Sequence, residues 1–287
     1  MNPQVTAFFE PISSTFSYVV SDPLSQRCAI IDPVLDYDAA AGRTSHASAE
    51  KIITYVREHG LTVDWLLETH VHADHLSAAH YLREQLGARL GIGAKITDVQ
   101  QTFADLFNAQ DGFARDGSQF DHLFADDEVF NIGGLAARAM HTPGHTPACM
   151  TYLIGDAAFI GDTLFMPDYG TARCDFPGGD ARSLYRSIQR IFALADTTRL
   201  FLCHDYKAPG REEFVCESSV AAQRTQNVHV HQGISEEQFV AMRTTRDATL
   251  SMPALILPAV QVNMRAGDLP PAEANGTRYL KIPLDRV

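Results

Sequence analysis

The sequence is poor in basic residues and in cysteine. Lys and Arg number 23 against 35 Asp and Glu, which gives a net charge of −12, and no run of basic residues could follow a phosphate backbone. Because nucleic-acid binding depends on clustered positive charge, we expect no nucleic-acid partner. The five cysteines are widely spaced and form no C-x-x-C pair, which predicts free thiols rather than a disulfide framework.

Long apolar runs are also missing. No stretch approaches the roughly 20 apolar residues that span a bilayer, and the first residues have neither the basic region nor the apolar core of an export signal. We therefore expect a cytoplasmic protein without a membrane partner. The 287 residues are 45% hydrophobic, which is enough for one large α/β domain or for a domain with an appendage.

Strand and helix patterns alternate along the chain. Gly133-Gly134 and Gly155-Asp156 each predict a hairpin turn, Asp180 predicts a helix cap, and a helix is expected to begin near His75. Apolar runs bounded by turn residues predict strands, and together the elements predict two mixed sheets between helices. The expected strands are 5–9, 16–21, 28–32, 63–68, 128–132, 135–141, 150–154, 157–160 and 200–203, and the expected helices include 49–56, 184–192 and 236–245.

Potential metal ligands gather where strands are expected to end. The segment Thr69-His70-Val71-His72-Ala73-Asp74-His75 places four imidazole or carboxylate groups within a few residues, just past an apolar strand. Three more follow later strands: His145, Asp162 and His204. Histidine and carboxylate suit zinc, iron and manganese, and a rigid sheet can position loop residues at its edge. The pattern therefore predicts a metal site.

These motifs resemble the metallo-β-lactamase superfamily. The run T-H-V-H-A-D-H resembles the family's T-H-x-H-x-D-H, and the later matches are T-P-G-H-T, G-D-T and C-H-D-Y, in the family's order. The resemblance implies an αββα sandwich with the metal site at one edge. In dinuclear members it implies one metal on His70, His72 and His145, and a second metal on the remaining ligands, with Asp162 bridging: Asp74, His75 and His204.

Two branches of that family compete. One is glyoxalase II, a dinuclear hydrolase of glutathione thioesters, and the other is the persulfide dioxygenases, which use one non-haem iron to oxidise glutathione persulfide. The stretch 170–176, G-T-A-R-C-D-F, resembles the dioxygenases' G-R-x-D-F, and 204–206, H-D-Y, resembles theirs rather than the H-E-Y of glyoxalase II. The resemblance favours a persulfide dioxygenase. A glyoxalase II-like hydrolase is the alternative, and a non-catalytic metal-binding protein is the third, less favoured possibility.

For a dioxygenase, the resemblance implies Fe(II) held by His70, His145 and Asp162. Two histidines and one carboxylate leave positions open for O₂ and for the substrate sulfur. His72, Asp74 and His204 would then act in catalysis by orienting ligands and water, with His75 beside them. The sequence retains every dinuclear ligand, so one or two zinc ions remain the alternative cofactor.

The expected substrate is glutathione persulfide or a related small thiol. The resemblance places Arg173 and Tyr185 near its carboxylates, although Arg173 could instead pair with Asp175, and Tyr185 could be a core residue of its helix. Tyr206 is a further candidate. Dioxygenases carry R-T-x-N-P-R downstream, where this chain has R-T-Q-N-V-H, so His229 stands in place of the arginine and could bind an anion when protonated.

Two expectations concern the rest of the chain. We expect a catalytic domain over residues 1–235 and a C-terminal extension over 236–287 that packs on it. The apolar, proline-containing stretch 252–262 predicts a covering segment or a dimer contact, and we expect a homodimer.

Overall fold

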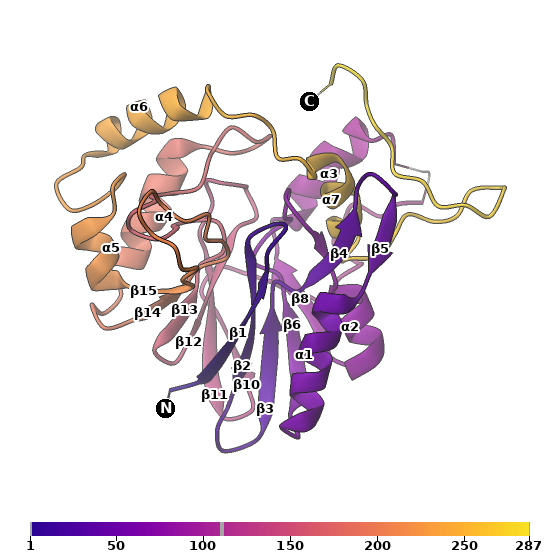
Figure 1. Cartoon of the computed structure of the whole chain (residues 1–287), viewed down its shortest axis with the longest axis horizontal. Helices are drawn as coiled ribbons and strands as arrows, with labels where there is room; N and C mark the ends of the chain where they lie inside the picture. The colour runs from indigo at the N-terminus through magenta and orange to yellow at the C-terminus, as the bar shows by residue number, and fades with distance from the viewer. Residues whose placement is uncertain (1, 110–111, 287) are drawn as a thin grey trace.

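The computed structural model describes residues 2–109 and 112–286, in which two sheets pack face to face between helices (Figure 1). One apolar cluster lies between the sheets and includes Phe16, Tyr18 and Phe159. A second lies between the first sheet and its helices, and a third between the second sheet and its helices. This is the αββα sandwich that the sequence predicted.

The first sheet leads into the metal motif, residues 69–75, which follows strand β6. Its first three strands pair antiparallel, and the remaining strands join in parallel. Side chains on β2 alternate between the two faces, so Tyr18 and Val20 enter the central cluster while Val19 faces the helices. The strand order is β1 (Gln4–Glu10), β2 (Thr15–Ser21), β3 (Arg27–Ile31), β6 (Thr62–Leu67), β8 (Arg89–Gly93) and β9 (His122–Phe124).

The second sheet leads to the three later ligands, His145, Asp162 and His204. Both predicted hairpins are confirmed, because β10 pairs with β11 across Gly133-Gly134 and β12 pairs with β13 across Gly155-Asp156. Only the β13–β14 pair in this sheet is parallel among the described strands. The order is β10 (Glu128–Ile132), β11 (Leu135–His141), β12 (Met150–Ile154), β13 (Ala157–Phe159), β14 (Arg199–Phe201) and β15 (Glu217–Ser219).

Local signals place the helices. The side chain of Asp180 accepts from Ser183 N at the start of α4, as predicted, and Ser235 with Gln238 forms a capping box on α6. Gly87 ends α2 in the left-handed conformation, with φ of 68°. The helices are α1 (Ala47–Glu58), α2 (Ala79–Leu86), α3 (Ile96–Leu106), α4 (Ala181–Phe192), α5 (Val220–Gln226), α6 (Glu236–Asp247) and α7 (Ile256–Asn263).

The expected helix start near His75 is wrong. Residues after the metal motif first form the short strand β7 (Leu76–Ser77), and α2 begins only at Ala79. The reason is that β7 pairs with β4 (Val34–Asp38), which also pairs with β5 (Arg43–Ser45) to make a small third sheet. This pairing holds the chain extended just beyond the metal ligands.

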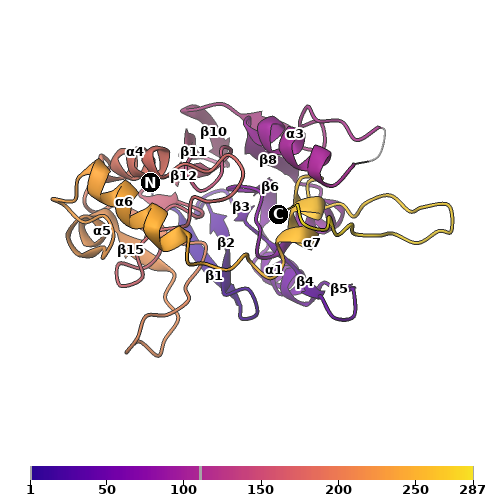
Figure 2. The same ribbon diagram turned by 90° about the horizontal axis from the view of Figure 1, so that it is seen from above.

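The C-terminal part crosses the molecule. After α6, which packs against α4 on the side of the second sheet, the chain passes over the upper ends of the strands to α7 beside the first sheet (Figure 2). Of residues 252–262, predicted as a covering segment or a dimer contact, the part in α7 packs against β7, and Ile256 and Val260 join the buried cluster between the first sheet and its helices. The five cysteines are all free thiols, as predicted. None of the described helices is long and apolar enough to cross a membrane.

Candidate metal centre

Seven predicted ligands meet at one edge of the two sheets. His70 follows the end of β6, His145 follows β11, Asp162 follows β13 and His204 follows β14, each after a turn of a few residues. The four ligand groups that follow the first sheet therefore face the three that follow the second, across the seam between the sheets. His70 is 1% exposed and His204 is fully buried. Strand-end placement brings together residues that are far apart in the sequence.

Two histidines and one carboxylate form the first group. The potential ligand atoms of His70, His145 and Asp162 all lie within 4.8 Å of one another. His145 Nδ1 lies 2.8 Å from the carbonyl oxygen of Arg173, so its Nε2 faces Asp162 Oδ2 at 3.6 Å. Thr69 Oγ1 lies 3.0 Å from His70 Nδ1, which turns His70 Nε2 toward the same point. This is the ligand trio predicted for iron, and the structure brings its members together.

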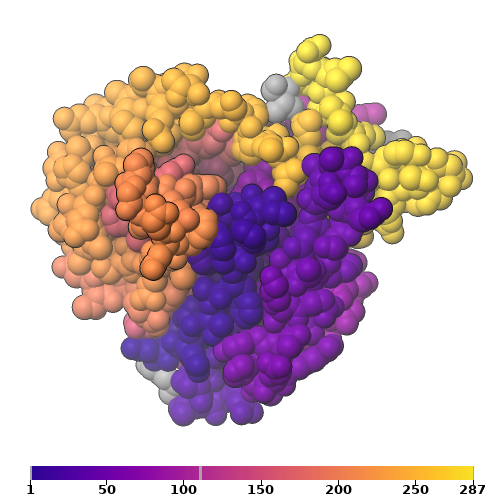
Figure 3. All heavy atoms as spheres, in the orientation of Figure 1, coloured from indigo at the N-terminus to yellow at the C-terminus, as the bar shows by residue number. Residues whose placement is uncertain are grey.

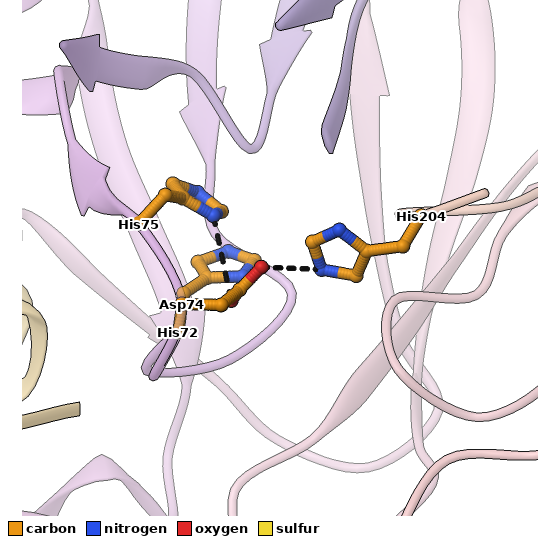
Figure 4. Close-up of side chains that lie close together, drawn as sticks. All are labelled: His72, Asp74, His75 and His204. Atoms are coloured by element: carbon orange, nitrogen blue, oxygen red, sulfur yellow. Dashed lines mark ion pairs between the residues drawn. The ribbon is translucent and has the colours of Figure 1, made fainter. Parts of the chain in front are cut away.

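The second group lies beside the first (Figure 4). Asp74 Oδ2 lies 3.2 Å from His204 Nε2, and Asp74 Oδ1 lies 3.6 Å from His75 Nδ1, as the dashed lines mark. Asp162 Oδ1 is 3.3 Å from His204 Nε2, so this carboxylate touches both groups. The group is completed by His72. The geometry accommodates the bridging position that the resemblance implies for Asp162.

Buried ligand atoms in both groups lack hydrogen-bond partners among the described residues. Buried polar atoms are nearly always satisfied, so a cluster of exceptions needs a cause. The donors are imidazole nitrogens and carboxylate oxygens, which suit iron or zinc. Burial, followed by the neighbouring histidines, lowers the pKa of His70 well below its usual value, which keeps the ring neutral as a metal ligand requires. The atoms are His70 Nε2, His72 Nδ1, Asp74 Oδ2, His75 Nε2, Asp162 Oδ1 and His204 Nε2.

Carboxylates behind the ligands orient His72. Its Nε2 lies 3.1 Å from Asp32 Oδ1 and 3.3 Å from Glu68 Oε2, which leaves Nδ1 to face the metal groups. Asp32 also accepts from Thr69 N and Oγ1, at 2.7 and 2.8 Å. Burial alone would lower the pKa of His72, but Asp32 raises it well above the usual value. Such carboxylate–histidine pairs fix ring orientation at metal sites.

Sequence reasoning missed these supports, although Asp32 and Glu68 carry the same signal as the ligands, since each lies just past the end of a strand. It also missed Thr15, whose hydroxyl lies 3.3 Å from His75 Nδ1 and 3.2 Å from His204 Nδ1. That hydroxyl aligns two ligands from different sheets.

The metal motif is also held from the far end of the chain. Asn263, buried at the end of α7, accepts from Ser77 N at 2.7 Å through Oδ1. Its Nδ2 donates to the carbonyl oxygens of His72 and His75, at 2.9 and 2.8 Å. One side chain thus satisfies three backbone groups of the motif. Nothing in the local sequence around Asn263 indicates this role.

A cavity of about 950 Å³ opens above the metal groups. Asp74, His145 and Asp162 form part of its floor, and Tyr206 forms part of a wall, stacked on His204 with ring centroids 5.5 Å apart. Figure 3 shows that the hairpin tips of the N-terminal half and the C-terminal segment meet at the same upper end of the molecule. Further lining residues from these parts are Ile12, Tyr37, Arg43, Arg246, Leu250 and Leu255.

The predicted substrate residues fall into two sets. Arg173 and Tyr206 line this cavity, but Arg173 also pairs bidentately with Asp175 at 2.6 Å, which is the structural alternative that the sequence left open. Tyr185 does not line it: its hydroxyl donates to the carbonyl of Ile234, and its ring packs beside α6.

His229 also lies outside the cavity lining. Its Nδ1 accepts from Thr171 N at 3.1 Å, and burial, followed by Arg243, lowers its pKa to about 4. The ring is therefore neutral at pH 7, and it lacks the positive charge on which the predicted anion contact depended.

Comparisons with known proteins place the chain in the family that its metal motifs resemble. Residues 12–204 match the metallo-beta-lactamase superfamily. A probable metallo-hydrolase of Burkholderia pseudomallei is 58% identical over 99% of each chain, and Glyoxylase B2 of Dictyostelium discoideum is 48% identical over 98% of this chain and 97% of that one.

Persulfide dioxygenases are also among the relatives. The human mitochondrial persulfide dioxygenase ETHE1 is 30% identical over 90% of this chain and 87% of its own. The crystal structure of ETHE1 from Myxococcus xanthus superposes with a TM-score of 0.73 at 29% identity, covering 92% of this chain and 100% of that one.

Proposed function

The chain belongs to the metallo-β-lactamase superfamily, and from that premise we propose that it is an iron-dependent dioxygenase of glutathione persulfide. The observation that carries the proposal is the trio of His70, His145 and Asp162, whose ligand atoms lie within 4.8 Å of one another and of which His145 and Asp162 line the cavity floor. Two histidines and a carboxylate on one face are the ligand set of non-haem Fe(II) oxygenases, because three coordination positions stay open. The likeness to ETHE1 in sequence and fold supports the same conclusion.

The reaction needs a site that binds a sulfur anion and excludes bulk water. The outer sulfur of the persulfide leaves as sulfite, with two oxygen atoms from O₂ and one from water, and the inner sulfur leaves as the thiol of glutathione. Fe(II), when bound, supplies the redox chemistry with O₂, and the protein supplies geometry. The stacked Tyr206 ring covers His204 and shields the floor on that side.

Asp74 is the residue placed to orient water or substrate at the metal groups. It is the only carboxylate of the second group, and it lines the cavity. Burial alone would raise the pKa of Asp74, but His204 and His75 lower it by a larger amount, so the group is a carboxylate at neutral pH. The charged group can accept a hydrogen bond from water or from the substrate's S–H group and so orient it at the metal groups.

The first test is oxygen consumption by Fe(II)-loaded protein supplied with glutathione persulfide. We expect rapid O₂ uptake with one sulfite released per O₂, and neither in a His70→Ala variant, which loses a ligand of the trio. Uptake without sulfite, or equal uptake by the variant, would count against the proposal.

A dinuclear hydrolase of glutathione thioesters is the second candidate. The observation that favours it is the complete second group, in which Asp74, His75 and His204 each have a buried atom without a hydrogen-bond partner among the described residues. The relatives that are 58% and 48% identical are named metallo-hydrolase and glyoxylase. A metal bound there would lower the pKa of a water molecule to about 7.

A His75→Ala variant separates the two reactions. In a mononuclear dioxygenase it keeps one iron per chain and most O₂ uptake, because His75 lies outside the trio. In a dinuclear hydrolase it loses one metal and the hydrolysis of S-lactoylglutathione by zinc-loaded protein. Thioester hydrolysis by the wild type, without O₂ uptake on persulfide, would replace the first candidate with the second.

A further inference from the structure

The mouth of the cavity is made by two segments outside the metal motifs. One is the hairpin of β4 and β5, which contributes Asp36, Asp38 and Arg43. The other is the last turn of α6 with the connection that follows it to α7, which contributes Arg246 and Leu255 and passes over the strand ends (Figure 2). Both segments face the same space above the metal groups, from opposite halves of the chain.

Each segment brings one arginine without an internal counter-charge. Arg43 and Arg246 line the cavity and are exposed, and neither forms an ion pair or a side-chain hydrogen bond with any residue that the structure describes. The other two lining arginines are committed, because Arg173 pairs with Asp175 and Arg243 pairs with Asp247. In a chain with net charge −12, two unpaired cations at one opening need an explanation.

The acidic residues of the same wall, Asp36 and Asp38, form no ion pair with Arg43 or Arg246. Asp36 accepts from Ser48 N and Oγ at 2.9 and 2.7 Å, where it holds the start of α1. Asp38 accepts from the backbone N–H groups of residues 40 and 41, at 3.0 and 3.1 Å, within its own turn. Both Asp36 oxygens and Asp38 Oδ1 accept these local hydrogen bonds, and neither carboxylate forms an ion pair with a described residue, so Arg43 and Arg246 keep their donors for a ligand.

We propose that Arg43 and Arg246 bind the carboxylates of the substrate, so that the site selects small persulfides with an anionic tail over neutral ones. The inference rests on the proposed function for the sulfur end of the ligand. Guanidinium groups bind carboxylates bidentately, and glutathione carries two carboxylates remote from its sulfur. Between the two arginines and the floor, the cavity is lined by apolar groups, among them Phe165, Phe176 and Leu255, which suit the uncharged middle of such a ligand.

Direct binding tests this assignment without turnover. Glutathione and its diethyl ester, in which both carboxylates are neutralised, are titrated calorimetrically into the iron-loaded protein. The variants are Arg43→Gln, Arg246→Gln and the double substitution. The matched control is Arg57→Gln on α1, an exposed arginine that does not line the cavity and has no ion pair among the described residues.

We expect the wild type to bind glutathione more tightly than the ester. Each cavity substitution should weaken glutathione binding about 10-fold, as for the loss of one charge-assisted contact. Binding of the ester, iron content and the Arg57→Gln control should not change. With glutathione persulfide as substrate, the loss is expected in KM.

Two results would overturn the proposal: equal affinity of the wild type for glutathione and its ester, or equal weakening of both ligands by the substitutions. The second result would mean that the arginines act on the fold. Failure of the dioxygenase function is distinguishable, because it would abolish O₂ uptake while charge-dependent binding of glutathione persisted.

Discussion

The floor of the cavity is buried and held from behind, whereas its mouth is exposed and held at few points. On the floor, His72 and His204 are fully buried, and supports such as Asp32 fix the ligand rings. At the mouth, Leu250 is 39% exposed, and Arg43 has no partner in the described part of the chain. The floor is arranged before any ligand arrives, while the mouth offers free donors to one.

This difference assigns the reaction to the floor of the cavity and the choice of substrate to its mouth. The floor carries the ligand set that the whole superfamily match covers, residues 12–204. At the mouth, Arg246 and Leu255 lie beyond that match, whereas Arg43 lies within it but outside the metal motifs. Substitutions in the two regions should therefore fail in different ways, and each prediction below tests that separation.

The largest effect is expected at Asp162, which reaches both ligand groups through Oδ2 and Oδ1. Asp162→Ala should abolish stable iron binding and reduce turnover about 1,000-fold or more, because it removes a shared ligand. Iron content by plasma spectrometry and O₂ uptake measure this. An iron-replete, active variant would show that the floor does not depend on the Asp162 carboxylate.

Arg243→Met should destabilise the mouth without emptying the floor. Arg243 is 1% exposed, pairs with Asp247 at 2.6 Å and donates to the carbonyl of Thr171, so it ties α6 to the loop that carries Arg173. Removing it leaves a buried carboxylate without its cation, and we expect a loss of about 3 kcal/mol in the free energy of unfolding.

Denaturant unfolding measures that loss, and the exposed Arg182→Met serves as the control, for which less than about 1 kcal/mol is expected. Iron content should stay close to that of the wild type. A parallel loss of iron would show that mouth and floor are one cooperative unit.

Asn263→Ala tests where the separation breaks down, because this residue lies in the C-terminal part of the chain but supports the floor. It leaves three backbone groups of the metal motif without their partner. We expect iron affinity to fall about 10- to 100-fold, as for other supporting residues of metal sites, and stability to fall by about 2 kcal/mol.

Chelator competition measures the affinity. The matched control is Gln261→Ala on the same helix, whose amide bonds Leu257 and Lys281 rather than the metal motif. If both variants bound iron equally well, Asn263 would be a support of the fold alone.

The smallest effect is a pH dependence from His229. Burial, then Arg243, lowers its pKa from 6.5 to about 4 in the folded protein. The unfolded chain binds the proton first, so stability falls as the pH drops from about 6.5 to about 4. We expect this component to be about 1 to 2 kcal/mol, because solvent partly screens the ring. His229→Gln should flatten the dependence of the free energy of unfolding on pH in that range. An unchanged slope would mean that other groups cause the pH dependence.

The sandwich and the metal ligands were predictable because their signals are local. Apolar alternation gives the strands, Asp180 caps α4 as its sequence indicates, and the ligands His70, Asp162 and His204 follow strand ends. The start of α2 was not predictable, since the pairing of β7 with β4 depends on a segment far away.

The supports and the mouth have no such local signal. Thr15, Asn263 and Arg246 acquire their positions only through contacts between distant parts of the chain. The same holds for Tyr185, where helix spacing gave the element but not which surface the hydroxyl would reach.

The hydrogen bonds of Asn263 also order events during synthesis. They join residues 186 to 191 positions apart, so the backbone of the metal motif acquires its last partner only after nearly the whole chain has been made. Contacts this distant in sequence form late, since a long loop must close first. A nascent chain that already displays His70, His72 and His75 lacks the helix that fixes them. We therefore expect tight iron loading to follow release from the ribosome, and C-terminal truncation before residue 263 to yield a chain that takes up metal poorly.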